Sequence, residues 1–323
     1  MTQQKSQTVL ILGPTGKSGR HTAKAFAAHG WQVRRFDRAR HDLVQEAHSA
    51  DVIYVGWHPS SYEKWAEELM PMHEKVIAAA KASGATVIMP GNVYNFGPDA
   101  PRGWTAATPH LATNPLARLR IQQEQMYKAS GVQTIILRAG DFIDTESSMT
   151  WFEMFIAAKV DKGFISYPGD LDTAHSWAYL PDLAEAVVHL AECRDQLATF
   201  EDVPFAGYTL TGQEMAEALS RALGQRIVAR RMSWLKFQLV RPFVPVLKGV
   251  FEMRYLWDLP HHLDGSKLAT LCPDFRATPV EIGLAQALRR IGKAGSFGAD
   301  TRQVDRDHDR AMRGDLRGER QKV

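Results

Sequence analysis

The sequence contains little cysteine, little net charge and no long apolar run. Its 323 residues include only two cysteines, Cys193 and Cys272, which lie too far apart for a zinc motif or a disulfide framework. We therefore expect two buried thiols in a reducing compartment. No apolar stretch approaches the roughly 20 residues that span a bilayer, and the polar N-terminus lacks the apolar core of a signal peptide. These absences predict a cytoplasmic protein with no transmembrane segment.

The net charge excludes little but points away from nucleic acid. It is +3, from 39 Lys and Arg against 36 Asp and Glu, and a nucleic-acid binder would need its cations concentrated on one face. A hydrophobic fraction of 45% excludes a wholly disordered chain. We expect a globular protein that binds a small molecule and no nucleic acid.

Short apolar runs alternate with helical patterns over the first 140 residues. The runs typical of buried strands lie at 8–12, 31–37, 51–56, 85–89 and 133–137, and the helical patterns at 17–29, 62–83 and 115–129. Such alternation with short loops is typical of a doubly wound parallel sheet. The predicted fold class is α/β of the Rossmann type, with a smaller C-terminal lobe that contains helical patterns at 149–158, 181–193, 212–223 and 279–291.

A glycine-rich loop, GPTGKSG, separates the first expected strand from the first expected helix. Glycines allow the tight turn and the close approach to a pyrophosphate, and the helix N-terminus supplies backbone donors and partial positive charge. Position 11 is Ile, so the loop lacks the first glycine of a nucleoside-triphosphate loop. The loop predicts a dinucleotide site with candidate contacts Gly13, Thr15, Gly16, Lys17, Ser18 and Gly19.

Two residues at the end of the second expected strand bear on the choice of cofactor. Asp37 stands where an acid commonly binds the ribose hydroxyls of NAD, and the adjacent Arg38 could instead receive the 2′-phosphate of NADP. The alternative for Arg38 is a solvated surface cation. The sequence leaves NAD and NADP open and leans toward NAD.

The glycine spacing resembles that of extended and atypical short-chain dehydrogenases/reductases, the NAD-dependent epimerase/dehydratase family. The resemblance covers about residues 7–292. Asp42 and Leu43 are similar to the pair that lies at the adenine in the family. Residues 50–53 resemble the family's fourth strand, and residues 182–184 resemble a motif that opens a helix of the substrate lobe. The resemblance implies NAD(P) binding and hydride transfer.

The chain departs from the family at all three residues of the usual proton relay. In the family a Ser or Thr acts with a Tyr-x-x-x-Lys pair, in which the Tyr is the general acid/base. Alignment places Asn92 at the Ser, Leu116 at the Tyr and Arg120 at the Lys. Leucine cannot transfer a proton, and arginine could hold the ribose but is effectively never deprotonated. We expect cofactor binding with a non-standard acid.

Several side chains could replace the missing acid. Tyr94 carries a phenol, the chemical type of the family's acid, at the carboxyl edge of the sheet where ligands bind. The alternative is that it is a packed loop aromatic. Asp141 lies where the family holds substrate, or it pairs with Arg138. His175 and Tyr179 lie on a substrate-side strand, or they satisfy local hydrogen bonds. The candidate catalytic residues are Tyr94, Asn92, Arg120 and Asp141.

The expected organisation has four parts. They are a flexible N-terminus (1–7), an NAD(P)-binding Rossmann domain (8–145), a substrate lobe whose late elements return to the sheet (146–293), and a disordered charged tail (294–323).

Residues 225–254 carry seven cations and one acid among large apolar residues. Three interpretations compete: an arginine-rich site for an anionic substrate such as a nucleotide-sugar, a surface for an anionic membrane or a partner, and cations that snorkel around a core helix pair. The last is preferred.

Two functions remain open. One is an NAD(P)-dependent epimerase/dehydratase-like or reductase-like enzyme that acts on a hydroxyl or carbonyl substrate. The other is an NAD(P)-binding protein that has lost catalysis and serves as a redox sensor or assembly partner. No metal is expected, and a homodimer is compatible with either function.

Overall fold

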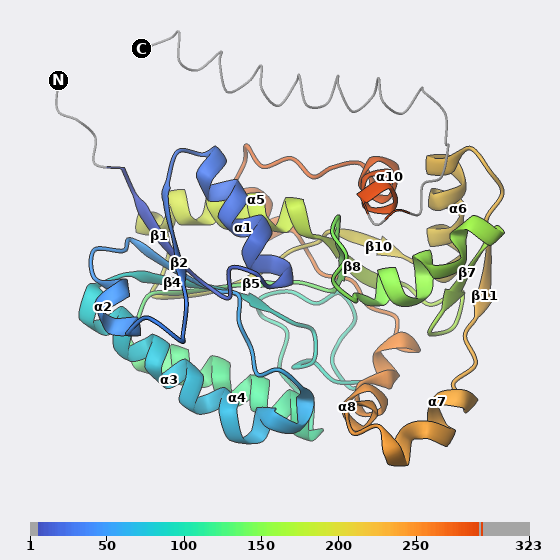
Figure 1. Ribbon diagram of the computed structural model, residues 1–323, viewed down its shortest axis with the longest axis horizontal. Helices are drawn as coiled ribbons and strands as arrows, with labels where there is room; N and C mark the ends of the chain where they lie inside the picture. Colours follow the sequence, from blue (N-terminus) through green and yellow to red (C-terminus); the bar gives the residue numbers. More distant parts are fainter. Residues whose placement is uncertain (1–5, 291, 293–323) are drawn as a thin grey trace, which may run out of the picture.

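The computed structural model describes residues 6–290 and residue 292 (Figure 1). The predicted tail, 294–323, lies outside the described residues, as do the first five residues of the predicted flexible N-terminus.

Six parallel strands form the central sheet, in the order β2-β1-β3-β4-β5-β9. Their bounds are Thr8–Leu12 (β1), Gln32–Phe36 (β2), Val52–Val55 (β3), Thr86–Gly91 (β4), Thr134–Arg138 (β5) and Phe200–Pro204 (β9). The predicted doubly wound parallel sheet is confirmed. Residues 50–53 resemble the family's fourth strand, but in this chain they lead into β3, the third strand. No further strand lies between β2 and β3, because one short helix connects them directly.

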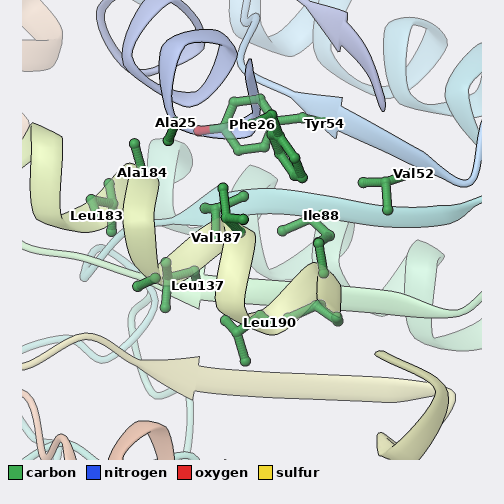
Figure 2. Close-up of a cluster of buried hydrophobic side chains, with 14 of the residues drawn as sticks. Ala25, Phe26, Val52, Tyr54, Ile88, Leu137, Leu183, Ala184, Val187 and Leu190 are labelled. Atoms are coloured by element: carbon green, nitrogen blue, oxygen red, sulfur yellow. The ribbon is translucent and has the colours of Figure 1, made fainter. Parts of the chain in front are cut away.

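Helices cover both faces of the sheet, because successive strand residues point to opposite sides and are buried on both. On one face Val52 and Ile88 pack under α1 (Lys17–Ala28) and α5 (Leu180–Glu192), as Figure 2 shows. On the other face, α2 (Leu43–Ala47), α3 (Trp65–Ser83) and α4 (Pro115–Ser130) cover the alternate strand residues. The helix that begins near residue 182 is therefore one of the late elements that return to the sheet.

A second cluster of buried apolar residues holds the smaller lobe together. Its two small sheets have the orders β10-β8-β6 and β11-β7. The elements are β6 (Asp141–Ile143), η2 (Phe152–Ile156), η3 (Ala157–Lys162), β7 (Phe164–Tyr167), β8 (His175–Tyr179), β10 (Tyr208–Leu210), α6 (Gly212–Leu223), β11 (Val228–Arg231) and α10 (Val280–Arg290). The short helix η4 (Arg194–Gln196) follows α5 at the central sheet instead, where the carbonyl oxygen of Arg194 accepts a hydrogen bond from Gln133. The helical pattern predicted over 149–158 corresponds to a short π-helix followed by a 3₁₀ helix rather than to a regular α-helix.

Arg230 and Arg231 of the basic segment lie on β11. The later part of the segment forms short helices at one corner of the molecule, drawn in orange in Figure 1. These are α7 (Leu235–Val240), η5 (Arg241–Phe243), α8 (Val246–Glu252) and η6 (Arg254–Trp257), followed by α9 (Ser266–Leu271). The preferred interpretation, cations around a core helix pair, is wrong for the first of these helices, because α7 buries none of its residues.

No helix among residues 6–290 is long and apolar enough to cross a membrane. Both cysteines are free thiols, but only Cys272 is fully buried, because Cys193 is partly exposed at the end of α5.

Candidate active site

The glycine loop lies at the carboxyl ends of β1 and β3, where the chain switches from one side of the sheet to the other. Open α/β sheets bind ligands at such a switch point. Gly13 has φ +76°, and a Cβ there would lie 3.0 Å from the backbone of Gly56 and Trp57. A Cβ on Gly19 would lie 2.1 Å from the carbonyl oxygen of Gly13. Both glycines are therefore required by close backbone approach.

The N-terminus of α1 is open to an anion. Gly16 occupies the N-cap position and supplies no side-chain hydrogen bond, and the first turn contains no acid. Its backbone N–H groups and the helix dipole therefore favour a phosphate group there. Ser18 is buried in this turn, and Thr15 is exposed at the loop tip.

Lys17 points away from this turn toward the smaller lobe. Its Nζ donates to the carbonyl oxygen of Met149 at 3.2 Å. Burial lowers the pKa of Lys17, while the nearby charges of Asp144 and Asp141 oppose that shift. Lys17 thus brings positive charge next to Asp141.

The residues predicted to bind the adenosine have local partners of their own. Asp37 accepts a hydrogen bond from the backbone N–H of Ala39 at 3.0 Å. Asp42 caps α2 by accepting from the N–H of Gln45, and Leu43 is buried in the core. Arg38 is exposed, and no carboxylate of residues 6–290 pairs with it.

Tyr94 follows β4, and its hydroxyl lies 2.9 Å from the hydroxyl of Tyr62. Both rings pack against the apolar cluster that contains Leu116, the residue aligned with the family's tyrosine. Burial raises the pKa of Tyr94 well above its usual value, and burial also raises the pKa of Tyr62. The two phenols therefore stay protonated at neutral pH and form a hydrogen-bonded pair beside the apolar Leu116.

Arg120, on α4, places a guanidinium near this pair. It lies over the ring of Trp65 at 5.0 Å, and one nitrogen donates to Gln123 Oε1 at 2.7 Å. Burial lowers the pKa of Arg120, whereas Glu124, Tyr94 and Tyr62 counteract the shift. At neutral pH the guanidinium remains charged and favours the ionised form of either phenol.

Asp141 begins β6 and accepts a hydrogen bond from His175 Nε2 at 2.8 Å. The imidazole of His175 is stacked on Trp257, with ring centres 4.1 Å apart and planes 2° apart. This stacking fixes the ring, so the carboxylate of Asp141 is oriented while its side chain keeps 34% exposure.

The alternative pairing of Asp141 with Arg138 is wrong. Arg138 is fully buried and donates to Glu124 and Asp202 instead. The same carboxylates lie with His110 in a group of three potential metal ligands. Because both carboxylates already accept hydrogen bonds from the guanidinium of Arg138, we assign this group to an internal ion-pair network rather than to a cation site.

Asn92, aligned with the family's serine, does not reach the tyrosine pair. Its side-chain oxygen accepts from the backbone N–H of Tyr94 at 3.1 Å, and its carbonyl oxygen accepts from Arg138 at 2.6 Å. Asn92 therefore shapes the loop that presents Tyr94. Tyr179 lies apart from the pair, with its hydroxyl bonded to Gln286.

The sequence reasoning missed Tyr62. It lies in η1 (Tyr62–Lys64), a short element between β3 and α3, and no motif marks it. The only available signal was its place shortly after a buried strand, at the edge of the sheet where ligands bind.

Comparisons with known proteins identify the fold. No protein-family model and no curated protein sequence matches the chain. MoeE5, solved in complex with UDP-glucose and NAD, is 13% identical with a TM-score of 0.68, over 88% of this chain and 98% of its own.

Two other solved structures are similar. A UDP-glucuronic acid 4-epimerase from Bacillus cereus, in complex with UDP-glucuronic acid and NAD, is 13% identical with a TM-score of 0.67 over 90% of this chain and 100% of its own. A UDP-N-acetylglucosamine 4-epimerase from Methanobrevibacter ruminantium M1 is 15% identical with a TM-score of 0.66 over 88% and 98%. The Rossmann architecture predicted from the alternation of strands and helices is confirmed at the level of the fold.

Proposed function

We propose that the chain is an NAD(P)-dependent enzyme that removes and returns a hydride at a hydroxyl-bearing carbon of a nucleotide-linked sugar. The observation that carries the proposal is the Tyr62–Tyr94 hydroxyl pair, held beside Arg120 at the carboxyl edge of the sheet. The solved structures with UDP-sugars and NAD share this fold, which supports the same class of cofactor and substrate here.

The glycine cradle fits the dinucleotide. A Cβ at Gly13 or Gly19 would clash with the protein's own backbone, so these glycines allow the tight turn that places the first turn of α1 at the pyrophosphate position. The free N–H groups of that turn would bind the pyrophosphate. Asp37 would bind the ribose, with Arg38 available for a 2′-phosphate. The bound nicotinamide would supply the hydride acceptor and donor.

Tyr94 would carry the proton in place of the aligned tyrosine. Because its pKa is raised by burial, the phenol is a donor at rest, suited to protonating a carbonyl that is being reduced. The hydroxyl of Tyr62 would then pass its own proton to the Tyr94 phenolate and take one up from solvent. When the substrate hydroxyl is oxidised, the same relay would run in reverse, so that its proton reaches Tyr94 while one leaves through Tyr62 to solvent, and the charge on Arg120 would stabilise the transient phenolate. Asp141, fixed by His175, would orient the substrate by accepting from a hydroxyl group.

The setting proposed for this activity is the one that the sequence allows. We propose a cytoplasmic enzyme with a small anionic substrate, no nucleic-acid partner and a homodimeric assembly.

Turnover on a panel of UDP-hexoses with NAD or NADP tests the function. The wild type should convert at least one sugar, and Tyr94→Phe should lower kcat by roughly 10²–10⁴, the usual contribution of a general acid. Tyr255→Phe is the matched control, because this tyrosine packs in the same cluster without joining the hydroxyl pair. It should stay within about twofold of wild type.

The second function, a catalytically silent cofactor-binding sensor, is favoured by one observation. Leu116 replaces the aligned tyrosine, and both remaining phenols resist ionisation because they are buried. Tight NAD(P) binding without turnover on any hydroxyl or carbonyl substrate would establish this function and contradict the enzyme.

A further inference from the structure

A segment of the smaller lobe projects from the molecule with its apolar side chains in solvent. Between residues 235 and 246, in α7, η5 and the start of α8, every residue except Phe237 is exposed. Leu235, Leu239 and Phe243, spaced four apart, are 62%, 69% and 84% exposed. A stripe of large side chains this exposed on consecutive turns is unusual for a surface that stays in water.

The projecting segment, residues 235–248, is also basic. Lys236, Arg241 and Lys248 are exposed on it, and no carboxylate of residues 6–290 pairs with any of them. Arg241 lies over the ring of Phe251 at 5.2 Å, so its charge stays at the edge of the apolar stripe. The segment itself contains no acid.

The projecting segment is firmly mounted on the protein. Trp234, just before α7, is buried and donates from its indole N–H to the carbonyl oxygen of Pro168 at 2.7 Å. Phe237 contacts Phe155 with ring centres 5.9 Å apart. The exposed stripe is therefore presented in a fixed orientation, away from the body of the lobe.

We propose that the projecting segment binds the surface of an anionic lipid membrane, with Leu235, Leu239 and Phe243 among the acyl chains and the cations at the headgroups. An amphipathic helix with aliphatic and aromatic residues on one side and Lys or Arg beside them binds membranes in this way. A second copy of the chain fits less well, because in a twofold dimer the same unpaired cations would face one another.

This orientation would place the candidate active site close to the membrane surface. Gly249, one turn beyond the start of α8, packs so closely on Tyr62 that a Cβ there would lie 2.5 Å from the tyrosine ring. The membrane-bound segment and the tyrosine pair are therefore parts of one rigid corner of the molecule.

Vesicle co-sedimentation of the full chain tests the proposal. Vesicles of phosphatidylcholine mixed with phosphatidylglycerol should bind the wild type at low salt, and vesicles of phosphatidylcholine alone should bind it much less. The K236Q/R241Q/K248Q variant should lose on the order of a hundredfold in partition coefficient, since each surface cation contributes roughly fivefold. L235S/L239S/F243S should lose at least about tenfold. V44S/L111S, which alters exposed apolar residues elsewhere, should bind as wild type does.

Circular dichroism and size-exclusion chromatography with light scattering complete the test. All three variants should remain folded, because the altered side chains are exposed. The proposal is overturned if the wild type ignores anionic vesicles, or if both segment variants bind them like wild type. A wild-type dimer that L235S/L239S/F243S converts to monomer, without vesicle binding, would assign the stripe to a second copy instead.

Discussion

Replacing Gly19 with alanine probes the closest backbone approach in the glycine loop. The added Cβ would lie 2.1 Å from the carbonyl oxygen of Gly13, whereas ordinary contacts begin near 3.4 Å. The start of α1 must therefore move by about 1 Å or more, and forced overpacking of this kind costs about 1–3 kcal/mol. Because this movement displaces the backbone donors from the pyrophosphate position, cofactor affinity should also fall, by roughly tenfold or more.

Two assays separate these effects. Urea denaturation without cofactor measures the loss of unfolding free energy, and calorimetric titration with NAD and NADP measures affinity. Gly30→Ala is the control, since no atom lies within 4 Å of its added Cβ and only the positive φ is strained. The control should lose about 1 kcal/mol of stability and no affinity. If Gly19→Ala matches wild type in both assays, the close-approach argument is wrong.

Three further predictions concern charge. Arg138→Met should destabilise the fold by about 3–5 kcal/mol in urea denaturation, because it leaves two carboxylates near the core unpaired, and a loss below about 1 kcal/mol would refute the buried network. Hydrogen bonds that His29 donates to Glu185 and Glu192 raise the pKa of His29 to about 10, so its stabilisation is complete below about pH 6.5 and is lost as the pH rises through 10. Wild type should therefore lose about 1–2 kcal/mol more unfolding free energy than His29→Gln between about pH 7 and pH 10. Curves of unfolding free energy against pH that run parallel for the two proteins would contradict this. Asp37→Ala should weaken NAD binding by roughly tenfold and leave NADP binding nearly unchanged, whereas equal effects on both would remove Asp37 from the ribose site.

Most of the sheet could be predicted from the sequence, because most of its strands appear as short apolar runs. A run such as Thr8–Leu12 is buried on both faces, so it is continuously apolar and ends at a glycine that the backbone requires. The sixth strand, β9, was not predicted, because Phe200–Pro204 is not a continuously apolar, buried run. The order of the strands was not predicted either, because apolar runs do not show which strands pair. The glycine loop could be predicted, because local backbone geometry fixes its residue types.

The tyrosine pair could not be predicted, because it depends on long-range packing. Tyr62 and Tyr94 meet only after the loops that follow β3 and β4 have packed against α8, and no local pattern records that contact. The hydrogen bond between Asp141 and His175 likewise joins residues from two strands of the small sheet. The exposure of α7 was mispredicted, because the sequence shows amphipathic spacing but not whether a neighbour covers the apolar side.

In the proposed function, Tyr94 moves the proton that accompanies hydride transfer. The most direct measurement is a single turnover, in which wild-type protein loaded with NAD or NADP is mixed with a converted UDP-sugar and the nicotinamide absorbance is followed. Wild type should show a transient reduction of the nicotinamide that Tyr94→Phe slows by roughly 10²–10⁴ with unchanged cofactor affinity. An equal rate of reduction in the two proteins would contradict it.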